Sequence, residues 1–311
     1  MANITAKDVA DLRAKTGLGM MDCKKALVES DGDIEKAIKY LREKGLATAA
    51  KKEARIAAEG LVDIMVKGDC AAMIEVNTES DFVAKNSNFQ EFVKGLLETI
   101  IAKQPKDVAE LMTLTFADTA ETVEATLIGK IAQIGEKLSI RRFVIVNGTV
   151  STYIHGTGVT GVIVKFDVDD AVKANAGFAE MAKNVALQIA AGNPPAYVTK
   201  EDVPASVVEE ELNIQVAAAK NDPKLAGKPD EVLKKIVAGK MGKLFYERVC
   251  LVEQEYVKDD SLTVGKYIAA CEKEFGGKIK VVGFNIFEKG EGIAKREEDF
   301  AEEIAKMVNK G

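Results

Sequence analysis

"NSNFQEFVKGLLETIIAKQP", residues 86–105, returns in altered form as "NAGFAEMAKNVALQIAAGNP", residues 175–194. Asn86 falls on Asn175 and Phe89 on Phe178, a shift of 89 residues (175 − 86). Apolar residues recur at helical spacing through the first copy, at Phe89, Phe92, Val93, Leu96, Leu97 and Ile100. The sequence therefore predicts one amphipathic helix present twice, and with it a duplicated structural unit.

Strand patterns accompany each copy of this helix. Residues 62–66 alternate in polarity, "KGD" turns the chain, and the alternation continues through residues 74–76, which predicts a hairpin. At the shift of 89, "MIEV" falls on "VIVK", so we expect the two hairpins to align without gaps. A third strand, "LSIRRFVIVNG", repeats at a shift of 141, as "IGEKLSIRRFVIV" and "FGGKIKVVGFNIF" show. The second copy should then carry an insertion of 52 residues (141 − 89).

The expected organisation is an α+β fold with a duplicated antiparallel sheet-plus-helix core. We predict a three-helix domain over residues 1–45, with Ser30 or Asp31 beginning the cap of its third helix, and a helical linker over 46–60. The core copies span 61–148 and 149–287. The second contains an antiparallel helical hairpin at about 203–250, between Pro194 and about Ser261. A C-terminal helical module over 288–311 carries Phe300, Ile304 and Val308 on one stripe.

Composition limits the classes of partner. The chain has 311 residues and a net charge of −6, with one short basic cluster that is typical of a solvated helix face. We therefore expect no direct binding to nucleic acid. No apolar run is long enough to cross a bilayer, and the first residues lack the features of a signal peptide. A cytoplasmic protein with no membrane partner is the expectation.

The residues that usually carry catalysis are scarce. There is one histidine, His155, in the glycine-rich turn "YIHGTG", and the four cysteines form no CxxC pair. Neither a phosphate-binding loop of the GxxxxGK[ST] type nor a GxSxG elbow occurs. We expect a protein that is not an enzyme and binds no cofactor or metal of its own.

One connection has an unusual composition. "NTESDFVAKN", residues 77–86, places an acid beside a large aromatic residue between a predicted strand and a predicted helix. At the shift of 89, Asp81 falls on Asp170 but Phe82 falls on Ala171. Two interpretations stay open: Phe82 fills its own core, or it is an exposed anchor for a partner, since binding energy concentrates in a few such side chains. The second interpretation predicts an exposed Phe82 at the tip of the first copy.

Two long motifs resemble the elongation factor Ts family. "LRAKTGLGMMDCKKAL", residues 12–27, looks like its N-terminal signature, and "EVNTESDFVAKNSNF", residues 75–89, is similar to its second signature. The order of head domain, duplicated core, helical insertion and C-terminal helix is also similar. The resemblance covers essentially the whole chain. It implies a guanine-nucleotide exchange factor of elongation factor Tu and a head of the ubiquitin-associated (UBA) type.

The resemblance also implies roles for individual residues. A loop would insert beside the partner's nucleotide site and disturb its Mg²⁺ ion; its residues are Ser80, where the family usually has Thr, and Asp81, Phe82 and Val83. Other residues would contact the partner: His155, whose glycine-rich turn differs from the family's basic variants, and Arg13, Met20 and Met21 in the head. The helical insertion is a candidate homodimer contact. The alternatives are a non-catalytic adaptor or scaffold, and an enzyme using Cys23 or His155.

Overall fold

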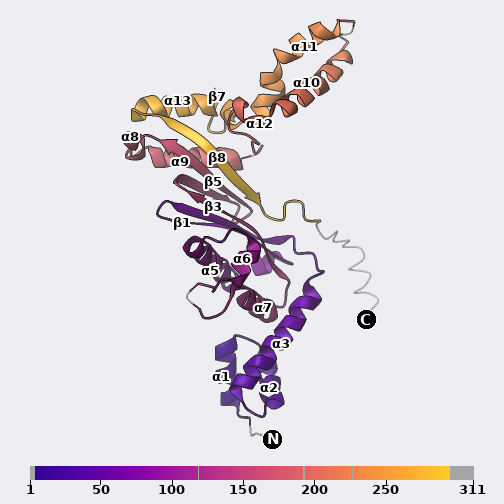
Figure 1. Ribbon diagram of the computed structural model, residues 1–311, viewed down its shortest axis with the longest axis vertical. Helices are drawn as coiled ribbons and strands as arrows, with labels where there is room; N and C mark the ends of the chain where they lie inside the picture. Colours follow the sequence, from indigo (N-terminus) through magenta and orange to yellow (C-terminus); the bar gives the residue numbers. More distant parts are fainter. Residues whose placement is uncertain (1–3, 118, 192, 224, 226, 295–311) are drawn as a thin grey trace.

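The computed structural model describes residues 4–294 except 118, 192, 224 and 226. Two three-stranded antiparallel sheets lie at the centre of this described part, with helices extending from both ends (Figure 1). The first sheet orders β1 (Glu59–Lys67), β2 (Cys70–Thr78) and β3 (Leu138–Asn147). The second orders β4 (Thr149–His155), β5 (Thr160–Val168) and β8 (Ile279–Glu288) in the same way. The predicted α+β class is confirmed, and the matching strand orders support the predicted duplication.

The two central strands are buried on both faces. On one face of β2, Ala72, Ile74 and Val76 pack with α5 (Ser87–Lys103), and α9 (Phe178–Ala190) covers β5 in the same manner. The other faces of β2 and β5 meet each other in a cluster that contains Ala71, Met73 and Ile163. The sheets approach so closely that a Cβ on Gly161 would lie 2.6 Å from Val62 Cγ1.

The first strands of the two hairpins align at a shift of 88 (152 − 64) and the central strands at a shift of 90 (163 − 73), so the predicted gapless alignment was wrong. Ile74 pairs with Phe143, and Val164 pairs with Phe284. The third strands keep their shift of 141 (284 − 143), whereas the central strands are offset by 90 (164 − 74). A slip of one residue would turn every inward side chain outward, so the pattern of burial determines the register.

The extra residue of the first copy lies between strand and helix. β2 ends at Thr78 and α4 (Asp81–Ala84) begins at Asp81, so two residues connect them. β5 ends at Val168 and α8 (Asp170–Lys173) begins at Asp170, so one residue connects them. The alignment of Asp81 with Asp170, and of Phe82 with Ala171, is therefore correct because it follows the helices.

The periodicity did not predict a second pair of equivalent helices, one in each copy. α7 (Val123–Ile134) and α13 (Val264–Phe275) begin after the capping residues Thr122 and Thr263 and end at glycines in the left-handed conformation, Gly135 and Gly276. Both precede the third strand of their sheet. The sequence also did not predict α6 (Val108–Thr113) or the small ribbon of β6 (Glu255–Tyr256) and β7 (Asp259–Thr263).

The insertion forms the predicted hairpin at one end of the molecule. α10 (Ala205–Lys220) packs beside α11 (Asp230–Ala238), as Figure 1 shows. A π-helical segment, η2 (Gly242–Tyr246), and a short α12 (Glu247–Val249) lead back toward the core. The single-turn helices η1 (Lys200–Asp202) and η3 (Leu251–Glu253) flank the hairpin at its base.

Three helices form the described part of the head: α1 (Ala6–Thr16), α2 (Met20–Glu29) and α3 (Ile34–Lys52). The cap of α3 is Asp33, which accepts the N–H of Lys36 at 3.1 Å, and not the predicted Ser30 or Asp31. Asp31 and the following glycine have positive φ angles and form the turn, so the cap comes later. The predicted Phe300, Ile304 and Val308 stripe lies outside the described residues.

The predicted linker 46–60 is helical only in its first part. α3 continues through it to Lys52, whose ammonium group donates to the carbonyl of Gly135 at the end of α7. The chain then turns, and β1 begins at Glu59. Gly60, with a φ of 126°, already belongs to β1 and lies against the backbone of β2, so the end of the predicted linker is a strand.

A buried carboxylate joins the first sheet to the segment after β8. Glu75 is fully buried and accepts hydrogen bonds from Asn77 (3.1 Å), Arg141 (2.9 Å), Arg142 (2.7 Å) and the Gly290 N–H (2.8 Å). Burial raises the pKa of Glu75, but the Gly290 N–H and the two arginines outweigh it and hold the pKa below its ordinary value. The charge is compensated by partners from three separate parts of the chain.

We expect Glu75→Gln to lower the free energy of unfolding by about 3–5 kcal/mol at neutral pH, because Arg141 loses its carboxylate partner and Arg142 keeps only the more exposed Glu291. This difference should shrink as pH falls below 4.5, the ordinary glutamate pKa. In that range Glu75 becomes protonated in the unfolded chain while the folded chain keeps it ionised, so wild-type stability decreases. Urea denaturation across this range measures both effects, with the exposed Glu98→Gln as control. A difference that does not change with pH would contradict the assignment.

Candidate functional site

Phe82 projects into solvent from α4, directly after the central strand of the first sheet. Its side chain is 81% exposed, the largest exposed fraction among the exposed large hydrophobic residues of the described chain. Val83, next to it, is half-buried and packs against the core beneath α5. The predicted exposure of Phe82 is confirmed, and the interpretation that it fills its own core is wrong.

Asp81 lies beside Phe82 as a paired but accessible carboxylate. Its Oδ2 accepts a hydrogen bond from Lys85 Nζ at 2.6 Å. This hydrogen bond, with the positive charges of Lys85 and Lys289, lowers the pKa of Asp81. Asp81 is therefore ionised at neutral pH. Because both side chains of the pair are largely exposed, a partner can replace Lys85 at little cost in free energy.

The backbone that precedes α4 is held by hydrogen bonds. Ser80 donates from its N–H to Glu136 Oε2 (3.0 Å) and from its hydroxyl to Glu136 Oε1 (2.6 Å). Thr78 donates to the Ser80 carbonyl at 2.7 Å, and Glu79 accepts the Lys137 N–H at 2.6 Å. The turn between α7 and β3 thus positions the segment that carries Phe82. No motif or spacing in the sequence marked Glu79 or Glu136 as parts of this site.

His155 ends β4 and is exposed, with Nδ1 3.4 Å from the hydroxyl of Tyr153. The turn that follows it lies on the first sheet, where the Gly158 carbonyl accepts the N–H of Val62 at 2.8 Å. α4 also packs on β1. The structure therefore brings the turn of His155 and the α4 segment to the same strand, although they come from different copies.

The predicted head residues lie on a separate part of the molecule. Arg13 is exposed on α1, and Met20 and Met21 begin α2 with exposed fractions of 42% and 76%. The head is joined to the core through α3, which packs on α7 (Figure 1). Arg13, Met20 and Met21 therefore form a second exposed group rather than part of the site around Phe82.

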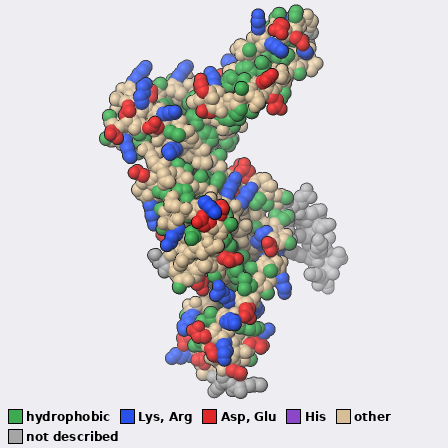
Figure 2. Space-filling view, in the orientation of Figure 1, with side chains coloured by type: hydrophobic (Ala, Val, Ile, Leu, Met, Phe, Trp, Pro, Cys, Tyr) green, Lys and Arg blue, Asp and Glu red, His purple; other side chains and the backbone are tan. Residues whose placement is uncertain are grey.

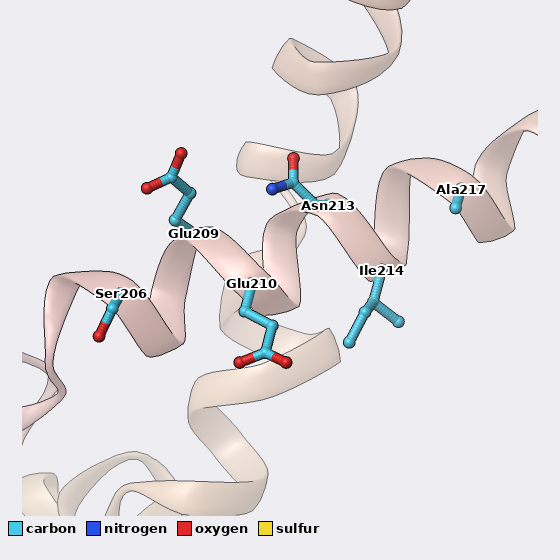
Figure 3. A pocket seen from close by; sticks show the side chains of 6 residues that line it. All are labelled: Ser206, Glu209, Glu210, Asn213, Ile214 and Ala217. Carbon is cyan, nitrogen blue, oxygen red and sulfur yellow. The ribbon is translucent and has the colours of Figure 1, made fainter.

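The outer face of α10 has a shallow, open hollow (Figure 3). Its lining residues come from this one helix: Ser206, Glu209, Glu210, Asn213, Ile214 and Ala217. In the close view, the side chains of Glu209, Glu210 and Ile214 extend away from the helix. A site for a small molecule usually has polar groups that converge on an enclosed space, and this surface has none.

The described residues offer little that suits covalent chemistry. They contain no group of three or more His, Cys, Asp or Glu side chains that could hold a metal ion. Cys23 is fully buried in the core of the head, and burial raises the pKa of Cys250 to about 11. Within residues 4–294, gaps excepted, no helix is long and apolar enough to cross a membrane. Figure 2 shows acidic and basic side chains intermixed over the visible face.

An exposed aromatic residue on a firmly held segment is typical of a protein that acts by contact with another macromolecule. Comparison with known proteins agrees with this class. The family model described as "Elongation factor TS" matches residues 79–291. Proteins named elongation factor Ts are similar over nearly the whole chain: 45% identity in Syntrophotalea carbinolica (98% of this chain, 99% of that protein), and 46% in Clostridioides difficile strain 630 (99% and 100%). The chain belongs to the elongation factor Ts family, a family of translation elongation factors.

We expect Phe82→Ala to change the free energy of unfolding by less than about 0.5 kcal/mol, because an exposed side chain contributes little to the core. Phe89→Ala is the matched comparison, since Phe89 is fully buried a few residues later. It should cost about 3–5 kcal/mol. Thermal or urea denaturation measures both variants. A large loss of stability in Phe82→Ala would mean that its side chain packs in solution.

Proposed function

We propose that this chain is a guanine-nucleotide exchange factor that binds elongation factor Tu in its GDP-bound state, displaces Mg²⁺ and promotes release of GDP so that GTP can bind. The observation that carries the proposal is the exposed Phe82 beside the ionised Asp81, on a segment held by Ser80 and Glu79. Membership of the elongation factor Ts family supports it.

The physical basis is reciprocal coupling. A protein that binds the empty partner more tightly than the nucleotide-bound partner weakens nucleotide binding by the same factor. Each tenfold weakening needs about 1.4 kcal/mol of differential contact. Mg²⁺ bridges phosphate oxygens and neutralises their charge, so a wedge that displaces the ion loosens the nucleotide.

The four residues of the loop have different tasks in this proposal. Phe82 supplies apolar contact, and burying it in the partner contributes about 1.5–3 kcal/mol. Asp81 brings a carboxylate near the Mg²⁺ ion, after giving up its pairing with Lys85. Val83 anchors α4 on the core, and Ser80 fixes the entry of the chain into α4.

The other exposed residues extend the contact. We propose that His155 approaches the partner's phosphate-binding region, beside the α4 segment. Arg13, Met20 and Met21 would dock a UBA-like head on the partner's nucleotide-binding domain. In this proposal the chain catalyses no covalent step, needs no cofactor, binds no nucleic acid directly and works in the cytoplasm.

A non-catalytic adaptor is the competing function. An adaptor would bind through the head and the hairpin without changing a nucleotide site. The two functions differ in what they require of Phe82: an exchange factor needs its wedging contact, whereas an adaptor that binds elsewhere does not.

The test is release of labelled GDP from purified elongation factor Tu. We expect the wild-type chain to accelerate release, and Phe82→Ala to reduce that acceleration by about 10- to 100-fold, from the lost contact area. Val282→Ala, which removes an apolar side chain exposed on the other sheet, is the control and should behave as wild type. If the wild-type chain does not accelerate GDP release, the exchange function is wrong and the adaptor function remains. If Phe82→Ala accelerates release as much as wild type, another residue supplies the wedging contact.

We also propose that the hairpin mediates homodimerisation. Apolar side chains are exposed on it at Ile214 (54%) and Val232 (40%). α10 carries exposed acidic residues, and α11 carries exposed Lys234 and Lys235 after the acidic residues of its first turn. Such a surface is complementary to a second copy of itself in a two-fold arrangement, with α10 of one chain against α11 of the other.

We expect Ile214→Asp to shift the chain from dimer to monomer in light scattering after size exclusion, because it buries a charge in that contact. Val282→Asp, exposed on β8 and remote in sequence, is the control. A wild-type chain that is monomeric at high concentration would contradict this proposal without affecting the exchange function.

A further inference from the structure

The two copies show which residue of the first is additional. The Lys137 N–H donates to Glu79 at 2.6 Å, and the Lys278 N–H, which is 141 residues later, donates to Asp169 at 2.6 Å. Glu79 and Asp169 therefore occupy equivalent positions. Both are followed by an acidic residue at the start of a four-residue helix, but only the first copy places Ser80 in between. Ser80 has no counterpart.

Glu136, which binds Ser80, also has no equivalent side chain. At the shift of 141 its position is taken by Gly277. A Cβ on Gly277 would lie 2.8 Å from Val172 Cγ2 and 3.0 Å from Asp169 Oδ2. In the second copy, α8 therefore occupies the space that a side chain at position 277 would need. In the first copy the equivalent side chain, Glu136, is present and binds the additional residue, Ser80.

The burial of the two short helices differs accordingly. Val172 on α8 is fully buried, whereas Val83, its counterpart on α4, is only half-buried. α4 packs on β1 and β2 of its own sheet, whereas α8 packs on α13, the helix before the third strand. Ser80 and Glu136 are therefore the residues that distinguish the connection before α4 from the connection before α8.

We propose that Ser80 and Glu136 form a paired insertion that holds α4 on β1 and β2, so that it does not pack on α7 as α8 packs on α13, and aims Phe82 at the partner, with Glu136 as a positioning residue. Both oxygens of one carboxylate bind both donors of Ser80, so the backbone entering α4 has one preferred orientation. The effect on exchange rests on the proposed function, but the effect on α4 does not. The two are therefore tested separately.

The first test uses Phe82→Trp as a reporter, because the chain contains no tryptophan. In that background we expect Glu136→Ala to lower the fluorescence anisotropy of the introduced indole, since α4 loses its fixed orientation. Ser80→Ala should lower it less, because the Ser80 N–H bond remains. Ser80→Thr, which keeps the hydroxyl, should retain the original anisotropy. Glu98→Gln, exposed on α5, is the control.

A second variant converts the first connection into the second. Deletion of Ser80 together with Glu136→Gly should seat α4 as α8 is seated. The indole of Phe82→Trp should then keep a high anisotropy without the Glu136 carboxylate, and it should stay accessible to acrylamide because the equivalent Ala171 is exposed. Urea denaturation establishes whether each variant is folded. If the deletion variant does not fold, the anisotropy of Glu136→Ala alone decides the test.

The functional test uses the natural Phe82. With elongation factor Tu, Glu136→Ala should lower the maximal rate of GDP release about 10-fold and leave the half-saturating concentration unchanged, because the head contacts remain. Unchanged anisotropy and unchanged release in Glu136→Ala would overturn the positioning role. If the anisotropy decreases but the wild-type chain does not release GDP, the positioning role stands and the exchange function fails.

Discussion

The double burial of β2 and β5 is the constraint on which the structure depends. Each strand places alternate side chains against its own helix and against the other sheet. A single copy would leave one apolar face of its sheet in water, so the copies stabilise each other. Small residues such as Ala71 and Gly161 at the contact let the sheets approach closely. Neither strand can slip by one residue without exposing its core side chains.

Because the strands cannot absorb an additional residue, the connection after β2 contains it. There the chain is at the surface, and Ser80 finds its hydrogen bonds at Glu136 without disturbing the core. The same place carries the exposed Phe82. The site has thus arisen where the two copies are free to differ. A fold that is rigid at its centre presents the side chain that the proposed function needs at its margin.

Periodicity and self-similarity predicted most of the fold. The repeated helix, the hairpins and the helical insertion follow from them, whereas for Phe82 they left a core position and an exposed position both open. The register between the strands of the two copies could not be predicted in this way. The identical residues lie in the helices, whereas the burial of the strands places the additional residue before Asp81. Caps such as Asp33 depend on which residue adopts positive φ, which the sequence leaves open. The role of Glu136 required distant contacts, although its alignment with Gly277 was visible.

The compensation of Glu75 has a consequence for the order of events during synthesis. Glu75 is made early, and the Gly290 N–H that binds it is 215 residues later. At about 5–20 residues per second, this interval lasts about 10–40 s. Once β3 has been made, the first sheet has its hydrophobic residues but still lacks one partner of its buried charge. Completion of the first copy therefore awaits the last strand of the second, which couples the folding of the core to the end of translation.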